Sequence, residues 1–253
     1  MKHTTTLALI CAICATAAAA FGQSAATVAT NAPPKNPPWD ISAAAGLTLT
    51  RGNSKTLLFT ANAAATKKWD EDLNELDLGA DGVYGENDNV KNAESLHGFA
   101  QYNRLFSERA FGYLRVEGLH DAIADVDYRL SVSPGAGYYL IKNTNTFLRA
   151  EIGPGYIYEK DGDGTHRSYM SLRLAERFEH KLNDHARIYE GVEFLPQVDR
   201  FGNYIINAEV GVETTMTKKL SLLCYIQDCY HSEPADDRLK NDIKLVSAIK
   251  YKF

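Results

Sequence analysis

Two short motifs combine a serine hydroxyl with a histidine imidazole, the pair of groups that nucleophilic catalysis uses. They are Ser95-x-His97 and His166-x-Ser168. Residues two apart lie on the same face of a strand, so each motif would bring its hydroxyl near a potential base. Acyl transfer also needs a group that orients the base and an oxyanion hole, and the sequence places neither. We therefore predict no catalytic residues and no enzyme activity, with a hydrolase as the alternative.

Oxygen-rich and thiol-bearing residues could hold a metal or form a disulfide. Asp161-Gly162-Asp163-Gly164 is similar to part of a calcium loop, but no glutamate follows at the distance that closes such a loop. A glycine-rich turn explains this motif with fewer assumptions. Cys224 and Cys229 lie five residues apart, so on a strand they point to opposite faces. We predict no metal site, no cofactor and no bridge between these two thiols.

The elements that must carry these residues are strands. From Trp39 to Phe253 apolar residues recur with a period of two, as in Ile41, Ala43, Ala45 and Leu47. The pattern predicts an all-β fold, a single antiparallel up-and-down transmembrane β-barrel of about twelve strands. The expected strands cover residues 40–51, 54–69, 73–85, 94–106, 109–119, 126–140, 146–159, 166–180, 185–195, 202–216, 219–231 and 241–253.

The connections between the expected strands alternate in character. Those beginning at residues 70, 107, 142, 182 and 217 are tight, and those at 87–93, 120–125, 160–165, 196–201 and 232–240 are longer and polar. The connection around Gly52-Asn53 lies on the same side as the longer connections, and it is the only short one expected there. Short turns on one side and long loops on the other are typical of outer-membrane barrels.

Aromatic residues at the strand ends fall on the apolar parity of their strands. Two belts of such residues are expected where an outer membrane meets water on each side, because an amphipathic ring has one dry and one wet side. The belt on the side of the tight turns contains Trp39, Trp69, Phe106, Phe178, Tyr251 and Phe253, and the belt on the side of the loops contains Tyr84, Tyr128, Tyr158 and Tyr204.

The opposite parity places a balanced set of charges inside the barrel. A selective pore biases its lining toward one sign, whereas eight acids and eight bases can pair and fill the interior. A wide channel needs roughly 16 strands, so we expect a structural barrel or a narrow pore. Besides Glu75, Lys244 and Lys250, the predicted interior network comprises Asp77, Asp81, Arg115, Glu117, Arg129, Arg149, Glu151, Arg173, Arg177, Arg187, Glu193, Glu209 and Glu213.

Two glutamates do not fit this alternation. Glu176 and Glu190 fall on the outward parity of neighbouring strands, equally far from the turn at Asn183. That spacing predicts that they lie directly opposite each other, which is unfavourable between strands and more so in lipid. Either a bulge or a wet edge relieves the repulsion, or the pair contacts a protein partner or a cation.

The N-terminal region differs in composition from the rest. Residues 1–22 have the order of a secretory signal peptide, with cleavage expected between residues 20 and 26. Residues 23–38 form a proline-rich linker, and the barrel follows from residue 39 to 253. The longest apolar run, Leu7 to Phe21, lies within the signal peptide, which argues against helical spans. The chain has no basic tail, which argues against nucleic acid as a partner.

Several glycine and aromatic motifs in order along the chain resemble a known family. They are Gly46-Leu47 with Arg51-Gly52-Asn53-Ser54, Asp127-Tyr128-Arg129-Leu130 with Gly135-Ala136-Gly137-Tyr138, and Lys250-Tyr251-Lys252-Phe253. Over Trp39 to Phe253 the chain resembles the salt-induced outer-membrane proteins, whose function is unassigned. The resemblance implies a Gram-negative outer membrane and brings no catalytic residues.

The end of the chain also resembles the signal read by the barrel-assembly machinery. Tyr251 and Phe253 provide its two aromatic residues, whereas Ala248 and Val246 stand where a glycine and a polar residue are usual. We therefore expect export through a cleaved signal peptide, outer-membrane lipid and the assembly machinery as partners, and a monomer.

Three hypotheses follow for function. The first is an outer-membrane barrel with a structural role in the envelope or a narrow passive pore for small solutes. The second is an outer-membrane hydrolase that uses a Ser/His pair, similar to an outer-membrane phospholipase. The third is a soluble periplasmic β-protein that binds an apolar ligand.

Overall fold

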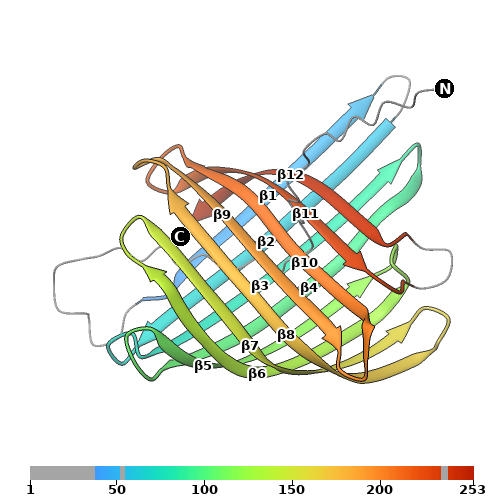
Figure 1. The fold of residues 1–253 in the computed structure, drawn as a ribbon. Coiled ribbons are helices and arrows are strands. Elements are labelled where there is room, and N and C mark those ends of the chain that lie inside the picture. The colour runs from blue at the N-terminus through green and yellow to red at the C-terminus, as the bar shows by residue number, and fades with distance from the viewer. Residues whose placement is uncertain (1–37, 52–54, 235–238) are drawn as a thin grey trace, which may run out of the picture.

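The computed structural model describes residues 38–51, 55–234 and 239–253. The predicted signal peptide, the linker except for its last residue, and the Gly52-Asn53 turn lie outside these residues. Twelve antiparallel strands close into one barrel, as predicted, with each strand hydrogen-bonded to the next and β1 to β12 (Figure 1). The strands are β1 (Asp40–Arg51), β2 (Lys55–Trp69), β3 (Asn74–Asn87), β4 (Val90–Leu105), β5 (Ala110–Asp121), β6 (Val126–Lys142), β7 (Thr146–Asp161), β8 (His166–Lys181), β9 (Ala186–Gln197), β10 (Arg200–Thr215), β11 (Leu220–His231) and β12 (Asn241–Lys252).

No helix in the part of the chain that the structure describes is long and apolar enough to cross a membrane.

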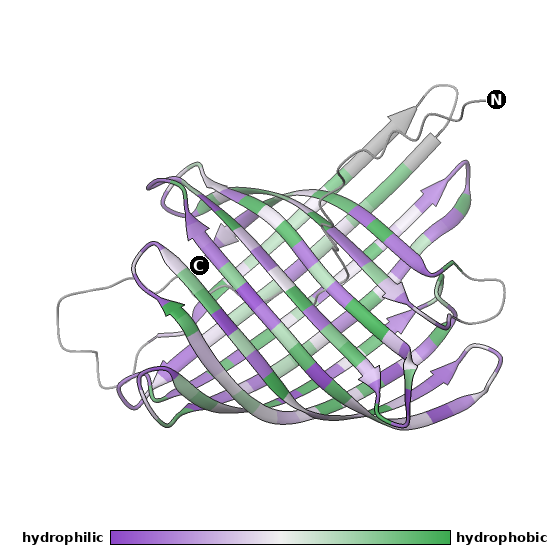
Figure 2. Ribbon diagram, in the orientation of Figure 1, coloured by the Kyte–Doolittle hydropathy of each residue, from purple (hydrophilic) through white to green (hydrophobic). Residues whose placement is uncertain are grey.

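Hydrophobic and hydrophilic residues alternate along the strands (Figure 2). The burial of the side chains shows that the outer face is mainly apolar and that the charged residues face the interior. On β7, for example, Glu151 is buried inside, whereas its neighbour Ile152 is 53% exposed on the outside. This arrangement is the reverse of a water-soluble protein, in which large apolar side chains face inward. Exposed aliphatic side chains occur on nine of the twelve strands and include Leu47, Leu96, Leu114, Val116, Leu130, Val132, Ile152, Met170, Val212, Leu222, Ile226, Ile243, Leu245 and Ile249.

The two ends of the barrel differ less than the sequence predicted. We call the end that carries Asp40, Lys252 and the five turns after even-numbered strands the turn end, and the opposite end the loop end. At the loop end, β3 and β4 are joined by Asp88-Asn89 alone, and β9 and β10 by Val198-Asp199. The prediction of longer loops at 87–93 and 196–201 was wrong, because both strands of each hairpin continue pairing into those segments.

The seam that closes the barrel is short. β1 pairs with β2 along its full length, from Asp40 opposite Thr66 to Arg51 opposite Lys55. Its pairing with β12 covers only Ser42–Ala45 against Ile249–Lys252. Neighbouring strands elsewhere pair over most of their lengths, as β7 and β8 do from Thr146 to Lys160. The first and last strands are therefore held together mainly near the turn end.

Candidate functional site in the barrel interior

Side chains from non-neighbouring strands meet inside the barrel. Gln101 on β4 donates a hydrogen bond to Glu151 on β7 at 3.1 Å. The Lys244 ammonium on β12 donates to the Ser95 hydroxyl on β4 at 3.4 Å. Arg149 on β7 lies 3.9 Å from Glu75 on β3. Because none of these strand pairs are neighbours in the sheet, the contacts bridge the lumen.

A buried ion-paired group lies in the barrel interior near the middle of β8, and we call it the waist. Arg173 on β8 donates to Glu151 on β7 at 2.7 Å and to Glu193 on β9 at 2.5 Å. The three side chains are 1%, 3% and 6% exposed, respectively. The Arg173 guanidinium also lies 5.2 Å from the ring centroid of Tyr113 on β5. Ion pairs across three adjacent strands, together with the ring of Tyr113, therefore fill part of the lumen at this level.

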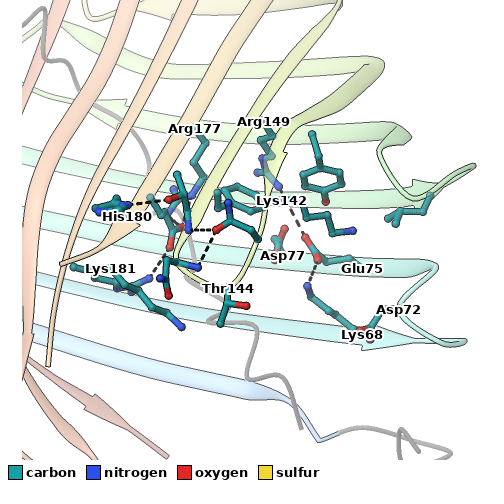
Figure 3. Close-up of a pocket in the computed structure, with 18 of the residues that line it drawn as sticks. Lys68, Asp72, Glu75, Asp77, Lys142, Thr144, Arg149, Arg177, His180 and Lys181 are labelled. Carbon is teal, nitrogen blue, oxygen red and sulfur yellow. Dashed lines mark hydrogen bonds and ion pairs between the residues drawn. The ribbon is translucent and has the colours of Figure 1, made fainter. Parts of the chain in front are cut away.

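A chamber of ≈ 240 Å³ lies on the turn-end side of the waist (Figure 3). We call it the turn-end chamber. Its wall holds fixed ion pairs: Lys68 with Glu75 at 2.8 Å, and Glu179 with both Arg177 and Arg187 at 2.7 Å. Its charged lining is mostly cationic, with Lys68, Arg115, Lys142, Arg149, Arg177, Lys181 and Arg187 against Asp72, Glu75, Asp77 and Glu179.

A smaller chamber of ≈ 80 Å³, the loop-end chamber, lies on the other side of the waist. At its wall the Nδ1 of His97 contacts Asp81 at 2.9 Å and its Nε2 contacts Glu117 at 2.6 Å. The charged lining here is mostly acidic, with Asp81, Glu117, Asp121, Glu193 and Asp242 against Arg129 and Lys244, besides His97 and His231. The balance of eight acids and eight bases in the predicted interior network therefore conceals a separation of charge along the barrel.

Neither Ser/His motif forms a catalytic arrangement. Both ring nitrogens of His97 are held by carboxylates, and the Ser95 hydroxyl is contacted by Lys244. His166 lies on the exposed outer face near the loop end, where its Nδ1 is 3.0 Å from the Tyr158 hydroxyl. A serine nucleophile needs a base within hydrogen-bond reach, and the partners of these histidines are other groups.

The Asp161–Gly164 segment forms the β7–β8 turn with its carboxylates already engaged. Asp161 accepts a hydrogen bond from Arg167 at 2.8 Å, and Asp163 accepts from the backbone and side chain of Thr165. Among the described residues, no group of three or more His, Cys, Asp or Glu side chains is arranged to hold a metal ion.

All sixteen interior residues named from the sequence lie on the inside of the barrel, buried or half-buried. Each has a protein partner, such as Arg187 with Glu213 at 2.5 Å and Glu209 with Gln227 at 2.9 Å. Sequence reasoning missed two acids that complete the network, Glu159 beside Arg129 and Glu179. It also missed the buried interior rings, which lie on the same strand parity as the charges: Phe99, Phe111, Tyr113, Tyr139, Tyr189 and Tyr225.

The ten aromatic residues assigned to the two belts lie at the strand ends, and none of them is buried. Two further tyrosines extend the same groups. Tyr102 stacks on Trp69 at the turn end with ring centroids 6.0 Å apart, and Tyr230 stacks on Tyr204 at the loop end at 5.6 Å. Both lie on the outward parity of their strands, so the signal for them was present in the sequence.

The prediction that Glu176 and Glu190 lie directly opposite each other was wrong. Glu176 lies opposite Val192, and Glu190 lies opposite Phe178. The four-residue turn at 182–185 shifts the register by two residues relative to a turn centred on Asn183. Both side chains still face outward, but as diagonal neighbours, which lie roughly 7–8 Å apart in an antiparallel pair. Direct repulsion is therefore weaker than the sequence suggested.

Comparisons with known proteins give similar solved structures and one family. The chain is similar to the "Translocator domain of autotransporter NalP from Neisseria meningitidis", with a TM-score of 0.47 and 12% identity. The similarity covers 85% of this chain and 87% of that chain. The "NanC porin" has a TM-score of 0.48 and 6% identity, with 84% of this chain and 97% of that chain covered. The "KdgM porin" has a TM-score of 0.45 and 8% identity, with coverages of 85% and 99%.

A comparison with protein families shows which family the chain belongs to. No curated protein matches the chain. One family model matches residues 43–253, which is most of the barrel. Its description assigns no function and does not mention salt, so a salt-induced character rests on the resemblance in the sequence alone. The chain belongs to the family described as "Protein of unknown function, DUF481".

Proposed function

We propose that the protein is an outer-membrane β-barrel whose lumen is closed at the waist and whose role is structural, in the integrity of the envelope. The exposed aliphatic outer face supports insertion in a membrane, since a soluble protein rarely exposes apolar patches larger than a few hundred Å². A closed barrel satisfies every backbone group within lipid, which makes this fold compatible with the hydrocarbon region.

The aromatic residues at both strand ends support the same location. Ring systems with a polar edge are stable at the interface between lipid and water, and these rings line both ends of the outer face. We propose outer-membrane lipid as the surrounding partner and a monomer as the working form. We further propose that the terminal Tyr251 and Phe253, whose ring centroids are 5.0 Å apart, are read by the barrel-assembly machinery during insertion.

The observation that carries the closed state is the waist. An open pore keeps a water-filled path, whereas Arg173 is 1% exposed and paired with two carboxylates. Gln101 on β4 also donates a hydrogen bond to Glu151, which adds a contact from a non-neighbouring strand to the waist. A guanidinium that holds two carboxylates in a fixed geometry resists displacement by a passing solute.

A narrow passive pore for small solutes is the second candidate. The observation that favours it is the presence of chambers on both sides of the waist, of ≈ 240 and ≈ 80 Å³. The waist around Arg173 lies between them. This function requires a rearrangement at the waist that joins the two chambers into one path.

Conductance in planar lipid bilayers separates these two functions. We expect the purified wild-type barrel to give no steady current steps. A triple variant, Arg173→Ser with Glu151→Ser and Glu193→Ser, removes the charged groups together and should conduct, because it shortens three side chains at the waist. Steady current from the wild type at the level of the triple variant would contradict the closed state and establish the pore. A folded but silent triple variant would show that the waist is not what closes the lumen.

A further inference from the structure

The lining of the turn-end chamber has a surplus of positive charge. Seven cationic and four acidic side chains line it. Three of these acids have described partners: Glu75 with Lys68 and Arg149, Glu179 with Arg177 and Arg187, and Asp77 with Thr66 at 2.7 Å. The fourth, Asp72, acts electrostatically on Lys142 at the mouth of the chamber. The remaining cations therefore set the sign of the field that a solute meets on entering from the turn end.

Lys142 is the cation best placed to act on a ligand. It ends β6 at the mouth of the chamber, beside the Asn143–Asn145 turn (Figure 3). Its ammonium donates to the backbone carbonyl oxygen of Glu108 at 3.2 Å, and none of its described contacts is a carboxylate. Lysine carries three donors, so this bond leaves donors for an anion. Lys181, also exposed at this mouth, adds a second positive charge.

An aromatic wall adjoins this ammonium. Lys142 lies 4.5 Å from the ring centroid of Tyr139, and Tyr139 packs edge-on against Phe147 with centroids 5.5 Å apart. Both rings line the chamber. A surface of this kind favours an anion with an apolar or planar body over a fully hydrated inorganic ion. The volume of ≈ 240 Å³ is below the roughly 300 Å³ at which pockets for drug-sized ligands begin, so the ligand must be small.

We propose that the turn-end chamber is a binding site for small organic anions, in which a carboxylate contacts Lys142 and an apolar body packs on Tyr139 and Phe147. The acidic loop-end chamber disfavours the same ligand, because five acids there face two permanent cations. The site goes beyond the proposed structural role, and it exists whether or not the barrel conducts.

Calorimetric titration of the folded, full chain in detergent micelles tests the site, with benzoate as the probe and empty micelles as the blank. We expect saturable heat from benzoate and none from benzamide, which has the same ring without the charge. Lys142→Gln should weaken benzoate binding about tenfold, because it removes one charge-assisted hydrogen bond. Lys244→Gln, the matched change in the loop-end chamber, should leave binding unchanged.

Three results would overturn the proposal. They are heat from the wild type equal to that of empty micelles, equal binding of benzamide and benzoate, or equal binding by Lys142→Gln and Lys244→Gln. Folding of each variant is checked by its heat-dependent shift on gels. If Lys142→Gln does not fold, Lys181→Gln serves as the second variant and should weaken binding several-fold by reducing the same surplus of charge. Calorimetry measures binding, whereas the test of the closed barrel measures current. A chamber that does not bind benzoate is therefore distinguishable from a barrel that is not closed.

Discussion

Two sites in the barrel share one design but differ in depth. At the waist, Arg173 lies between Glu151 and Glu193, which come from the strands on either side of β8. Near the loop end, His97 on β4 lies between Asp81 on β3 and Glu117 on β5. Each site places one cationic or protonatable side chain between carboxylates of the two neighbouring strands.

The difference lies in the central residue and its access to water. Arginine keeps its charge at all physiological pH values, whereas an imidazole can gain or lose a proton. The waist side chains are 1–6% exposed, while His97, Asp81 and Glu117 are 10%, 21% and 17% exposed. A permanent charge thus occupies the dry position and a titratable one occupies the chamber wall. The registers differ as well, since His97 lies directly opposite Asp81, whereas Arg173 lies opposite Gly153 and reaches Glu151 diagonally. The comparison teaches that carboxylates from two flanking strands can hold either a permanent or a titratable charge, depending on the central side chain.

The largest expected effect comes from removing the charge at the waist alone. Arg173→Met removes the cation that two buried carboxylates share, although Glu151 keeps Arg149 at 3.1 Å. We expect it to lower the free energy of unfolding by about 3–5 kcal/mol. Urea unfolding in lipid vesicles measures the loss. The triple variant Arg173→Met with Glu151→Gln and Glu193→Gln removes all three charges and should recover most of the stability. A single variant as stable as wild type would show that the waist is not tightly packed.

A smaller effect is expected from the residue opposite Arg173. Gly153 on β7 is its direct cross-strand partner, and a Cβ there would lie 2.1 Å from the carbonyl oxygen of Pro134. Gly153→Ala should therefore cost about 1–3 kcal/mol by forcing β6 and β7 apart. Gly202→Ala is the matched control, since a Cβ there meets no atom within 4 Å. Equal stability of the two variants, measured by the same unfolding assay, would argue against this close approach.

The smallest effect should occur at the loop-end site. His97→Gln removes two contacts with carboxylates, but water in the chamber can replace part of them, so we expect a loss of about 1–2 kcal/mol. His180→Gln is the control, because its Nδ1 contacts only the neutral hydroxyl of Thr146, at 2.9 Å. If His97→Gln cost as much as Arg173→Met, burial would not distinguish the two sites, and the comparison between them would fail.

The sequence predicted the closed barrel because apolar and polar residues alternate along each strand, and this alternation decides which side chains face lipid and which face the interior. Side chains of opposite polarity on successive residues, repeated over twelve segments, leave a closed cylinder as the arrangement that satisfies both faces. The same parity located the interior charges. It could not locate the separation of charge between the chambers, because that depends on the height of each residue along tilted strands, and hence on register between strands.

Register was also where the sequence misled. The number of residues in each turn decides which side chains lie opposite each other, and an error of two residues moved Glu190 from Glu176 to Phe178. The tight turns at Asp88-Asn89 and Val198-Asp199 were predicted as longer loops for a related reason. Polar residues at a loop end do not distinguish a true loop from a strand pair that extends into water.

The short seam between β1 and β12 has a consequence for how the cylinder is completed. Its ends are tied by an ion pair of 2.6 Å between Asp40 and Lys252, residues separated by nearly the whole folded chain. Joining such distant segments costs the most chain entropy of any pairing in the molecule, yet it gains the shortest run of ladder hydrogen bonds. The hairpin pairings between consecutive strands are therefore more stable than the pairing of β1 with β12. We expect β1 and β12 to be the first neighbouring strands to separate when the barrel is destabilised.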